Sequence, residues 1–181
     1  ILHLFFYFFY RFQKANLFFG LGCLFLFIFY LYQAIAFKYF YYLSDITIFT
    51  SIYWFIRHPA HLFQLIAVYL IFSVHKGFIF KLLIGIVCFF LFIPFFNLQI
   101  PFLVNTELRT IVSTIIFLDV ARVSTIAWRS KKDGSWIILG GSIIYVIFTI
   151  ASNIPYESSI PRHIFTNIGT LSVPISITLF L

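Results

Sequence analysis

Two charged side chains inside an otherwise apolar stretch have the strongest claim to chemistry in this sequence. Asp119 and Arg122 lie three residues apart within residues 109–127, so on a helix they project from one face. A charge inside hydrocarbon is costly unless it is paired or hydrated, which makes such residues functional candidates. The pair is either a local ion pair that fixes helix packing or a polar switch between two packing states. Proton or ion transport through Asp119 is a third interpretation, although no second acid lies in another apolar stretch to continue a relay.

The histidines offer a weaker case for a metal site. His58 and His61 flank Pro59 at a spacing that a helix can use for two ligands, but a catalytic metal needs at least a third. Asp45 and His163 are the only candidates on that side, and they lie on separate loops. We therefore interpret the two histidines as interfacial and water-facing, and we predict no metal, no cofactor and no catalytic residue. The sequence has no phosphate-binding glycine loop, no nucleophile elbow, and no Lys in residues 163–181 for a retinal Schiff base.

Composition places these residues in a bilayer. The 181 residues are 62% hydrophobic and 23% aromatic but only 9% charged, whereas soluble domains have about a quarter charged residues. A soluble enzyme, a disordered chain and a secreted disulfide scaffold are excluded. Cys23 and Cys88 each lie in an apolar stretch and are interpreted as packing residues.

Charges and turn formers cut the chain into segments long enough to cross a membrane. We predict seven spans at residues 1–10, 17–37, 59–74, 82–96, 109–127, 135–150 and 163–181. Residues 39–56 are interpreted as interfacial, with one long helix from Ile46 as the alternative, and Pro174 predicts a kink in the last span. The fold class is an all-α transmembrane bundle, with residues 1–181 as a single domain. The sequence contains no Met and both ends are apolar, so we expect a fragment whose first and last spans are truncated.

Loop charges predict the orientation, because Lys and Arg are retained on the cytoplasmic side. One set of alternate loops carries seven basic residues and the single acid Asp133: Arg11, Lys14, Lys76, Lys81, Arg129, Lys131 and Lys132. The other set carries four basic residues and three acids: Lys38, Arg57, Arg109 and Arg162, with Asp45, Glu107 and Glu157. The first set is predicted to be cytoplasmic, which places the N-terminal side outside and the C-terminal side inside a cytoplasmic (inner) membrane. This bias accounts for the net charge of +7 without a nucleic-acid partner.

Several segments resemble one family. They are the basic turn from Arg11 to Lys14 leading into Asn16-Leu17-Phe18-Phe19-Gly20, the long aromatic loop after the second span, the cluster Arg129-Ser130-Lys131-Lys132, and Trp136-Ile137-Ile138-Leu139-Gly140. The chain thereby resembles the bacterial seven-transmembrane receptors with diverse intracellular signalling modules. The resemblance implies an extracellular ligand-binding domain before the seven helices and a cytoplasmic kinase or cyclase module after them, in the same chain.

The expected function is therefore a non-enzymatic, signal-transducing membrane domain of a bacterial sensor. Asp119, Arg122 and Pro174 are the candidates for its two-state element, and membrane lipids and a second copy of the chain are its candidate partners. Two alternatives stay open. A multipass acyltransferase-like enzyme would need a His with an adjacent acid, which Arg57-His58 with Asp45 approximates poorly. A small transporter subunit would need inverted repeats and polar midplane residues, and no internal repeat is visible.

Overall fold

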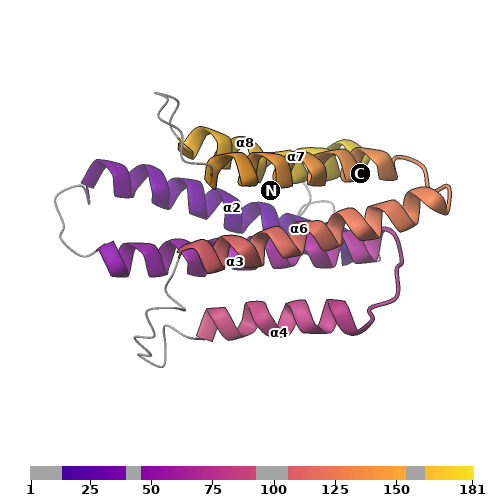
Figure 1. Ribbon diagram of the computed structural model, residues 1–181, viewed down its shortest axis with the longest axis horizontal. Coiled ribbons are helices and arrows are strands. Elements are labelled where there is room, and N and C mark those ends of the chain that lie inside the picture. Colours follow the sequence, from indigo (N-terminus) through magenta and orange to yellow (C-terminus); the bar gives the residue numbers. More distant parts are fainter. Residues whose placement is uncertain (1–13, 40–45, 93–105, 154–161) are drawn as a thin grey trace. The chain divides into compact units, whose positions relative to one another are not determined.

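The computed structural model describes residues 14–39, 46–92, 106–153 and 162–181, and within these ranges the chain is all-helical (Figure 1). The described part contains six α-helices and no strand, as its composition predicts. They are α2 (Lys14–Tyr39), α3 (Ile46–Ile71), α4 (Phe78–Phe92), α6 (Thr106–Arg129), α7 (Ser135–Asn153) and α8 (Arg162–Phe180). Five predicted spans thus have a helix at their position, and a sixth, residues 59–74, overlaps the second half of α3. The predicted first span, residues 1–10, lies outside the described residues.

Helix α3 differs from the preferred interpretation. It runs without interruption from Ile46 to Ile71 with Pro59 inside it, so the alternative of one long helix from Ile46 is correct. Where the crossing begins along this helix stays a prediction. Proline removes one backbone donor and disfavours the preceding turn. Here Pro59 and Ala60 are both buried, and packing on both sides of the proline holds the helix together despite the lost bond.

Length and hydropathy identify a membrane protein. Among the described residues, three helical stretches are long and apolar enough to cross a bilayer: Lys14–Ile35, Thr110–Arg129 and Ser135–Ser152. Three shorter apolar stretches accompany them, Phe55–Ile71, Phe78–Leu91 and Asn167–Phe180. Many large apolar side chains on these helices face outward, including Phe78, Ile147 and Leu179, as expected where lipid rather than water is the surrounding solvent. The count of seven spans stays a prediction.

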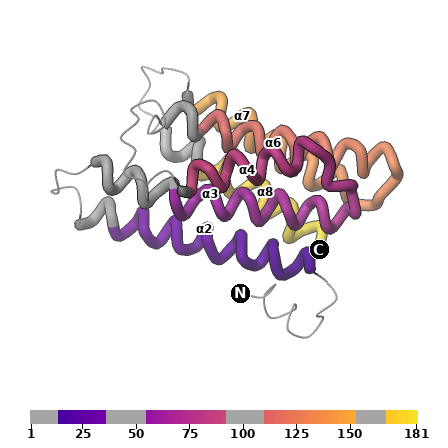
Figure 2. The backbone as a smooth tube through the Cα atoms, turned by 90° about the horizontal axis from the view of Figure 1, so that it is seen from below, coloured from indigo at the N-terminus to yellow at the C-terminus, as the bar shows by residue number. Residues whose placement is uncertain are grey.

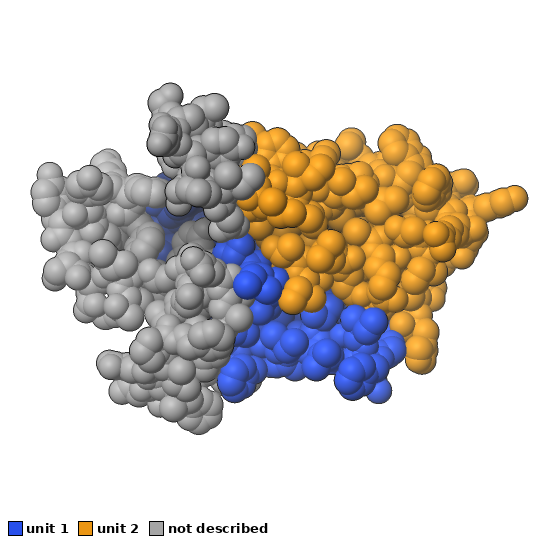
Figure 3. All heavy atoms as spheres, in the orientation of Figure 1, with its two compact units in different colours: residues 1–67, 76–112 blue, residues 68–75, 113–181 orange. Residues whose placement is uncertain are grey.

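The chain divides into two compact units, coloured separately in Figure 3. Unit 1 contains α2, α4, the first turns of α6, and α3 as far as Ala67. Unit 2 contains the end of α3 from Val68, α6 from Ser113, and α7 and α8. Each unit has its own buried side chains, so the two are described one at a time.

In unit 1, helices α2 and α3 lie side by side (Figure 2). The ring of Phe63 on α3 packs against Phe18 and Phe25 of α2, with centroid distances of 6.1 and 5.6 Å. Gly22 lets the two backbones approach, because a Cβ there would lie 3.2 Å from the carbonyl oxygen of Ala60. A small residue at the contact is what close packing of membrane helices requires.

In unit 2, helices α7 and α8 pack still more closely, again at a glycine. A Cβ on Gly141 would lie 2.7 Å from Cβ of Ser176 and 2.8 Å from the carbonyl oxygen of Ser172. The hydroxyl of Ser172 donates a hydrogen bond of 2.8 Å to the carbonyl of Gly141, so a polar bond accompanies the close approach. One turn further along α7, the ring centroid of Tyr145 lies 3.8 Å from that of Phe117 on α6.

Left-handed residues end two helices of unit 2. Ser73 follows α3 with φ 51°, and Lys131 follows α6 with φ 56°. In both cases the backbone amides turn back onto helix carbonyls, in the pairs Ser73 to Leu70, Val74 to Tyr69, Lys131 to Trp128 and Lys132 to Ala127. The two hydrogen bonds at each helix end satisfy carbonyls that would otherwise be left unpaired. Both turns are therefore well-defined supports for the side chains beside them.

Candidate functional site

Asp119 is the buried acid of unit 2. It lies on α6, where its side chain is only 4% exposed, and its carboxylate binds two partners. Arg122 Nε donates to Oδ1 at 2.7 Å, so the ion pair suggested by the three-residue spacing is present. Tyr69, from the end of α3, donates its hydroxyl to Oδ2 at 2.8 Å.

A third hydrogen bond, between Arg122 and Tyr69, completes the arrangement. Arg122 Nη2 donates to the hydroxyl oxygen of Tyr69 at 2.7 Å, so Tyr69, Asp119 and Arg122 form a polar triangle in which every pair is hydrogen-bonded. Both oxygens of the carboxylate accept a bond, and the triangle contains one positive and one negative charge. Hydrogen bonds to charged groups are the strong ones, and this network ties α3 to α6.

The two charges of the polar triangle are unequally buried. The side chain of Arg122 is 41% exposed, against 4% for Asp119. An arginine near a helix end can extend its head group to the membrane surface, and Arg122 lies two turns before the end of α6. Asp119 has a short side chain and no such route, so its charge depends on its two partners.

Tyr69 was not among the residues that the sequence singled out. The only signal is indirect: a tyrosine buried near a helix end needs a partner for its hydroxyl, and Tyr69 is 1% exposed. Nothing in the sequence says which of several helices supplies that partner.

An aromatic contact lies beside the polar triangle at the end of α3. The ring of Phe72 meets the ring of Phe180, at the end of α8, edge to face with a centroid distance of 5.4 Å. Phe180 also packs on Gly134, where a Cβ would lie 2.8 Å from its ring. The ammonium of Lys132 donates to the carbonyl oxygen of Phe72. Because Tyr69 and Phe72 lie three residues apart, the same end of α3 contacts both α6 and α8.

Pro174, the third candidate for the two-state element, lies inside α8. Its carbonyl oxygen accepts a hydrogen bond of 2.8 Å from the hydroxyl of Thr178. Proline at this position removes the amide bond to the preceding turn. Pro174 belongs to neither helix of the polar triangle, and the kink remains a prediction.

Unit 1 has a different polar feature, which the sequence did not reveal. Arg57, His58, His61 and Gln64 on α3 are between 0% and 5% exposed, and their spacing places them along one side of the helix. We call them the α3 strip. The guanidinium of Arg57 lies 5.7 Å from the ring centre of Phe29 on α2, and His58 lies 6.1 Å from the ring of Phe90 on α4.

This burial corrects the interpretation of the two histidines. His58 and His61 are 2% and 0% exposed, so they are interior residues and do not face water. Their i, i+3 spacing gave no way to tell an inner helix face from an outer one. Asp45 lies outside the described residues, as does the side chain of His163. Among the residues that the structure describes, no group of three His, Cys, Asp or Glu side chains could hold a metal.

The basic residues of the predicted cytoplasmic set lie at the surface wherever the structure describes them. Arg57, counted among the loop charges of the other set, is instead buried inside α3. Lys14, Lys76, Lys81, Arg129, Lys131 and Lys132 are exposed, and Arg11 lies outside the described ranges. Lys76 also lies 5.5 Å from the ring centre of Phe80. The thiols of Cys23 and Cys88 are free and half-buried, consistent with packing residues.

Comparison with protein-family models, curated proteins and solved structures finds no match for this chain. The resemblance to seven-helix receptors therefore remains a proposal. The features that bear on function are the contacts and hydrogen bonds within each unit, above all the buried acid of the polar triangle and the aromatic contact next to it.

Proposed function

We propose that the chain is the signal-transducing part of a bacterial membrane sensor, related to the seven-transmembrane receptors with intracellular signalling modules. It crosses a cytoplasmic membrane with seven helices, its N-terminal side outside and its C-terminal side in the cytoplasm. An event outside changes helix packing, and the end of α8 passes the change to a cytoplasmic effector in the same chain. Residues 1–181 themselves carry out no catalysis in this proposal.

The observation that carries the proposal is the dual contact at the end of α3. Tyr69 bonds Asp119 of α6 at 2.8 Å, and Phe72 packs on Phe180 of α8 at 5.4 Å. A displacement of α3 that breaks the first contact also shifts the second, because both residues belong to one helix end. Packed interfaces of this kind respond by moving between discrete arrangements. The end of α8 is therefore coupled to the state of the carboxylate.

The unequal burial of the two charges allows the polar triangle a second arrangement. In the first state Arg122 and Tyr69 both bind Asp119. In the second, Arg122 extends to the membrane surface, which its 41% exposure makes accessible, and α3 supplies a different partner or none. An input needs to change this balance by only about 1 to 3 kcal/mol to shift the populations several-fold or more.

The orientation is tested by reporter fusions. A reporter inserted in the turn at Lys131, and another placed after Leu181, should both report the cytoplasm. A reporter in that turn which reports the outer side contradicts the proposed direction of signalling, whatever the chemistry of the polar triangle.

The signalling step is tested by joining a cyclase catalytic domain after Leu181 and measuring cyclic nucleotide in cells. Asp119→Asn should change the output by about fivefold, since weakening a charged hydrogen bond removes roughly 1 kcal/mol from one of the two states. Asp133→Asn, at an exposed acid on the turn between α6 and α7, is the matched control and should leave the output unchanged. A folded Asp119→Asn protein with unchanged output contradicts the proposal.

A transporter subunit is the second candidate, and the α3 strip is the observation that favours it. Transporters place polar side chains at the membrane midplane, and Arg57 and His61 occupy the middle of α3. The continuity of α3 argues the other way, since broken helices are typical of such sites. Proton or anion flux into vesicles that contain the protein, abolished by Arg57→Gln, would favour the transporter.

A further inference from the structure

The turn between α6 and α7 has an unusual combination of side chains at a defined depth. The apolar stretch of α6 ends at Arg129 and that of α7 begins at Ser135, so we expect residues 130–134 to lie where the hydrocarbon ends. Trp128 and Trp136, on the two sides of the turn, are 56% and 64% exposed. Exposed tryptophans at helix ends are typical of the headgroup layer.

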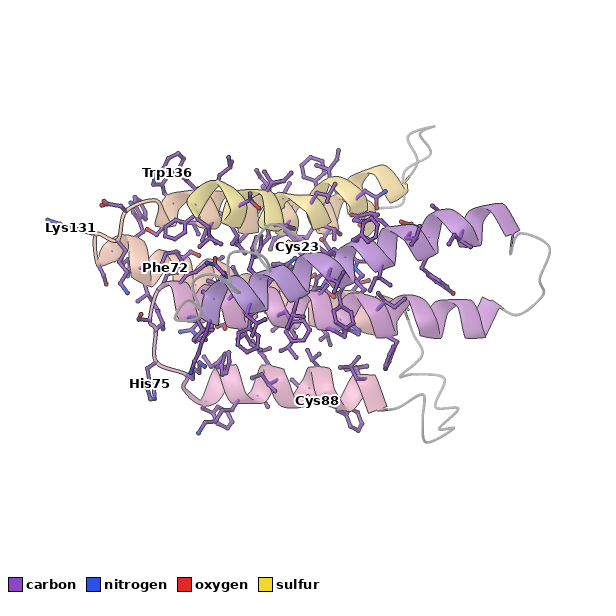
Figure 4. The ribbon with its side chains drawn as sticks, turned by 180° about the vertical axis from the view of Figure 1, so that it is seen from behind. Cys23, Phe72, His75, Cys88, Lys131 and Trp136 are labelled. Carbon is purple, nitrogen blue, oxygen red and sulfur yellow. The ribbon has the colours of Figure 1, made fainter. Side chains whose placement is uncertain are left out.

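The charges of the turn are predominantly positive. Arg129, Lys131 and Lys132 are accompanied only by Asp133, which leaves an excess of two positive charges. Lys132 is already engaged, because its ammonium donates to the carbonyl of Phe72. Arg129 and Lys131 are exposed, and Figure 4 shows Lys131 extending from the turn at the same end of unit 2 as Trp136.

The turn is also held in one conformation. Lys131 occupies the left-handed region at φ 56°, as does Gly134 at φ 68°. Ser135 donates its hydroxyl to the carbonyl of Lys132 at 2.7 Å, and the ring of Phe180 packs on Gly134. A fixed turn presents its cations with a small loss of conformational entropy on binding.

We propose that this turn binds the headgroup of an anionic phospholipid. The phosphate lies between Arg129 and Lys131, while Trp128 and Trp136 pack beside the glycerol and the upper acyl chains. Charge complementarity selects an anion, and the indoles together with the depth of the turn select one that is attached to a lipid. This inference concerns a ligand of the membrane surface and does not depend on the signalling proposal.

Tryptophan quenching by brominated lipids tests the site directly. The sequence has three tryptophans, Trp54, Trp128 and Trp136, and Trp54→Phe leaves only the two that flank the turn. The protein is placed in phosphatidylcholine vesicles that contain a minor fraction of either brominated phosphatidylglycerol or brominated phosphatidylcholine. At equal fractions the anionic lipid should quench more strongly, and high salt should reduce the difference.

Two double variants decide the assignment. Arg129→Gln with Lys131→Gln should lower the relative association of the anionic lipid by about tenfold. Lys76→Gln with Lys81→Gln removes the same charge from other exposed positions and should leave the preference intact. The proposal is overturned if the wild type shows no preference, or if the two double variants lose it equally. It is also overturned if soluble glycerol phosphate abolishes the preference, because the turn then recognises a free phosphate rather than a lipid.

Discussion

Helix α3 contributes to two buried polar regions, and they differ in the charges they combine. In unit 2 it supplies Tyr69 to the polar triangle, which holds one acid, one base and a hydrogen bond along each side. In unit 1 it supplies the α3 strip, which contains Arg57 and two histidines but no acid. The first region is neutral and internally satisfied. The described contacts of Arg57 and His58 in the strip are with the aromatic rings of Phe29 and Phe90, so a similar degree of burial accompanies different surroundings in the two regions.

The amide of Gln64 marks the difference most clearly. It is fully buried, and neither its oxygen nor its nitrogen has a hydrogen-bond partner among the described residues. Its neighbour across the helix contact is Gly22 of α2. In the polar triangle, by contrast, the hydroxyl of Tyr69 both donates and accepts a bond.

The largest effect is expected where the polar triangle loses its cation. Arg122→Ala leaves the carboxylate of Asp119 buried without its charged partner and should reduce the free energy of unfolding by about 3 kcal/mol, near the lower end for broken buried pairs because Arg122 is partly exposed. Unfolding in detergent micelles measures it. Arg129→Ala, at an exposed arginine of the same helix, should change stability by no more than about 0.5 kcal/mol. Equal effects of the two substitutions would show that Asp119 does not depend on Arg122.

Substitutions at the helix contacts should give the next largest loss of stability, and the loss should again be larger in unit 2. Gly141→Ala places a methyl group 2.8 Å from a backbone carbonyl of α8 and should destabilise by about 2 kcal/mol through overpacking. Gly22→Ala in unit 1 meets its nearest carbonyl at 3.2 Å and should lose about half as much. Gly140→Ala has nothing within 4 Å and should instead stabilise α7 by about 0.5 to 1 kcal/mol. Thermal unfolding of the three variants must give this order for the packing to be as described.

The smallest effects should differ in sign between the two polar regions. Tyr69→Phe removes a hydroxyl bonded to both Asp119 and Arg122 and should destabilise by about 1.5 kcal/mol. Gln64→Leu replaces a buried amide by an apolar group of similar size and should stabilise by about 1 kcal/mol. Both are measured by unfolding in the same detergent. A destabilising Gln64→Leu would mean that the amide is satisfied in the membrane and that the α3 strip resembles the polar triangle.

The sequence predicted the parts of this structure that depend on local pattern. Helices occur at five of the predicted positions because long apolar stretches favour membrane-spanning helices. The three-residue spacing of Asp119 and Arg122 indicated the ion pair that the structure contains. Where a side chain's partner comes from another helix, local pattern has no information. That is why Tyr69 was missed, why His58 and His61 were interpreted as water-facing, and why the contact between Phe72 and Phe180 had no precursor in the sequence.

The two prolines inside helices also show that local sequence does not reveal contacts with other helices. Pro59 was taken to begin a crossing, yet α3 continues through it, whereas Pro174 was accepted inside a helix and is found there. The local cost of a proline is similar in both places. The burial of Pro59 and Ala60 depends on neighbouring helices, which the sequence does not specify.

The most direct test of the account measures whether the polar triangle controls the position of the end of α8. Spin labels on cysteines at Ser73 and Leu181, both exposed, flank the contact between Phe72 and Phe180, in a background with Cys23 and Cys88 replaced by Ser. Their distance is measured in lipid by electron paramagnetic resonance, with and without Asp119→Asn. We predict a second, clearly populated distance in the variant. One unchanged distance distribution in both proteins, with the variant folded, would contradict it.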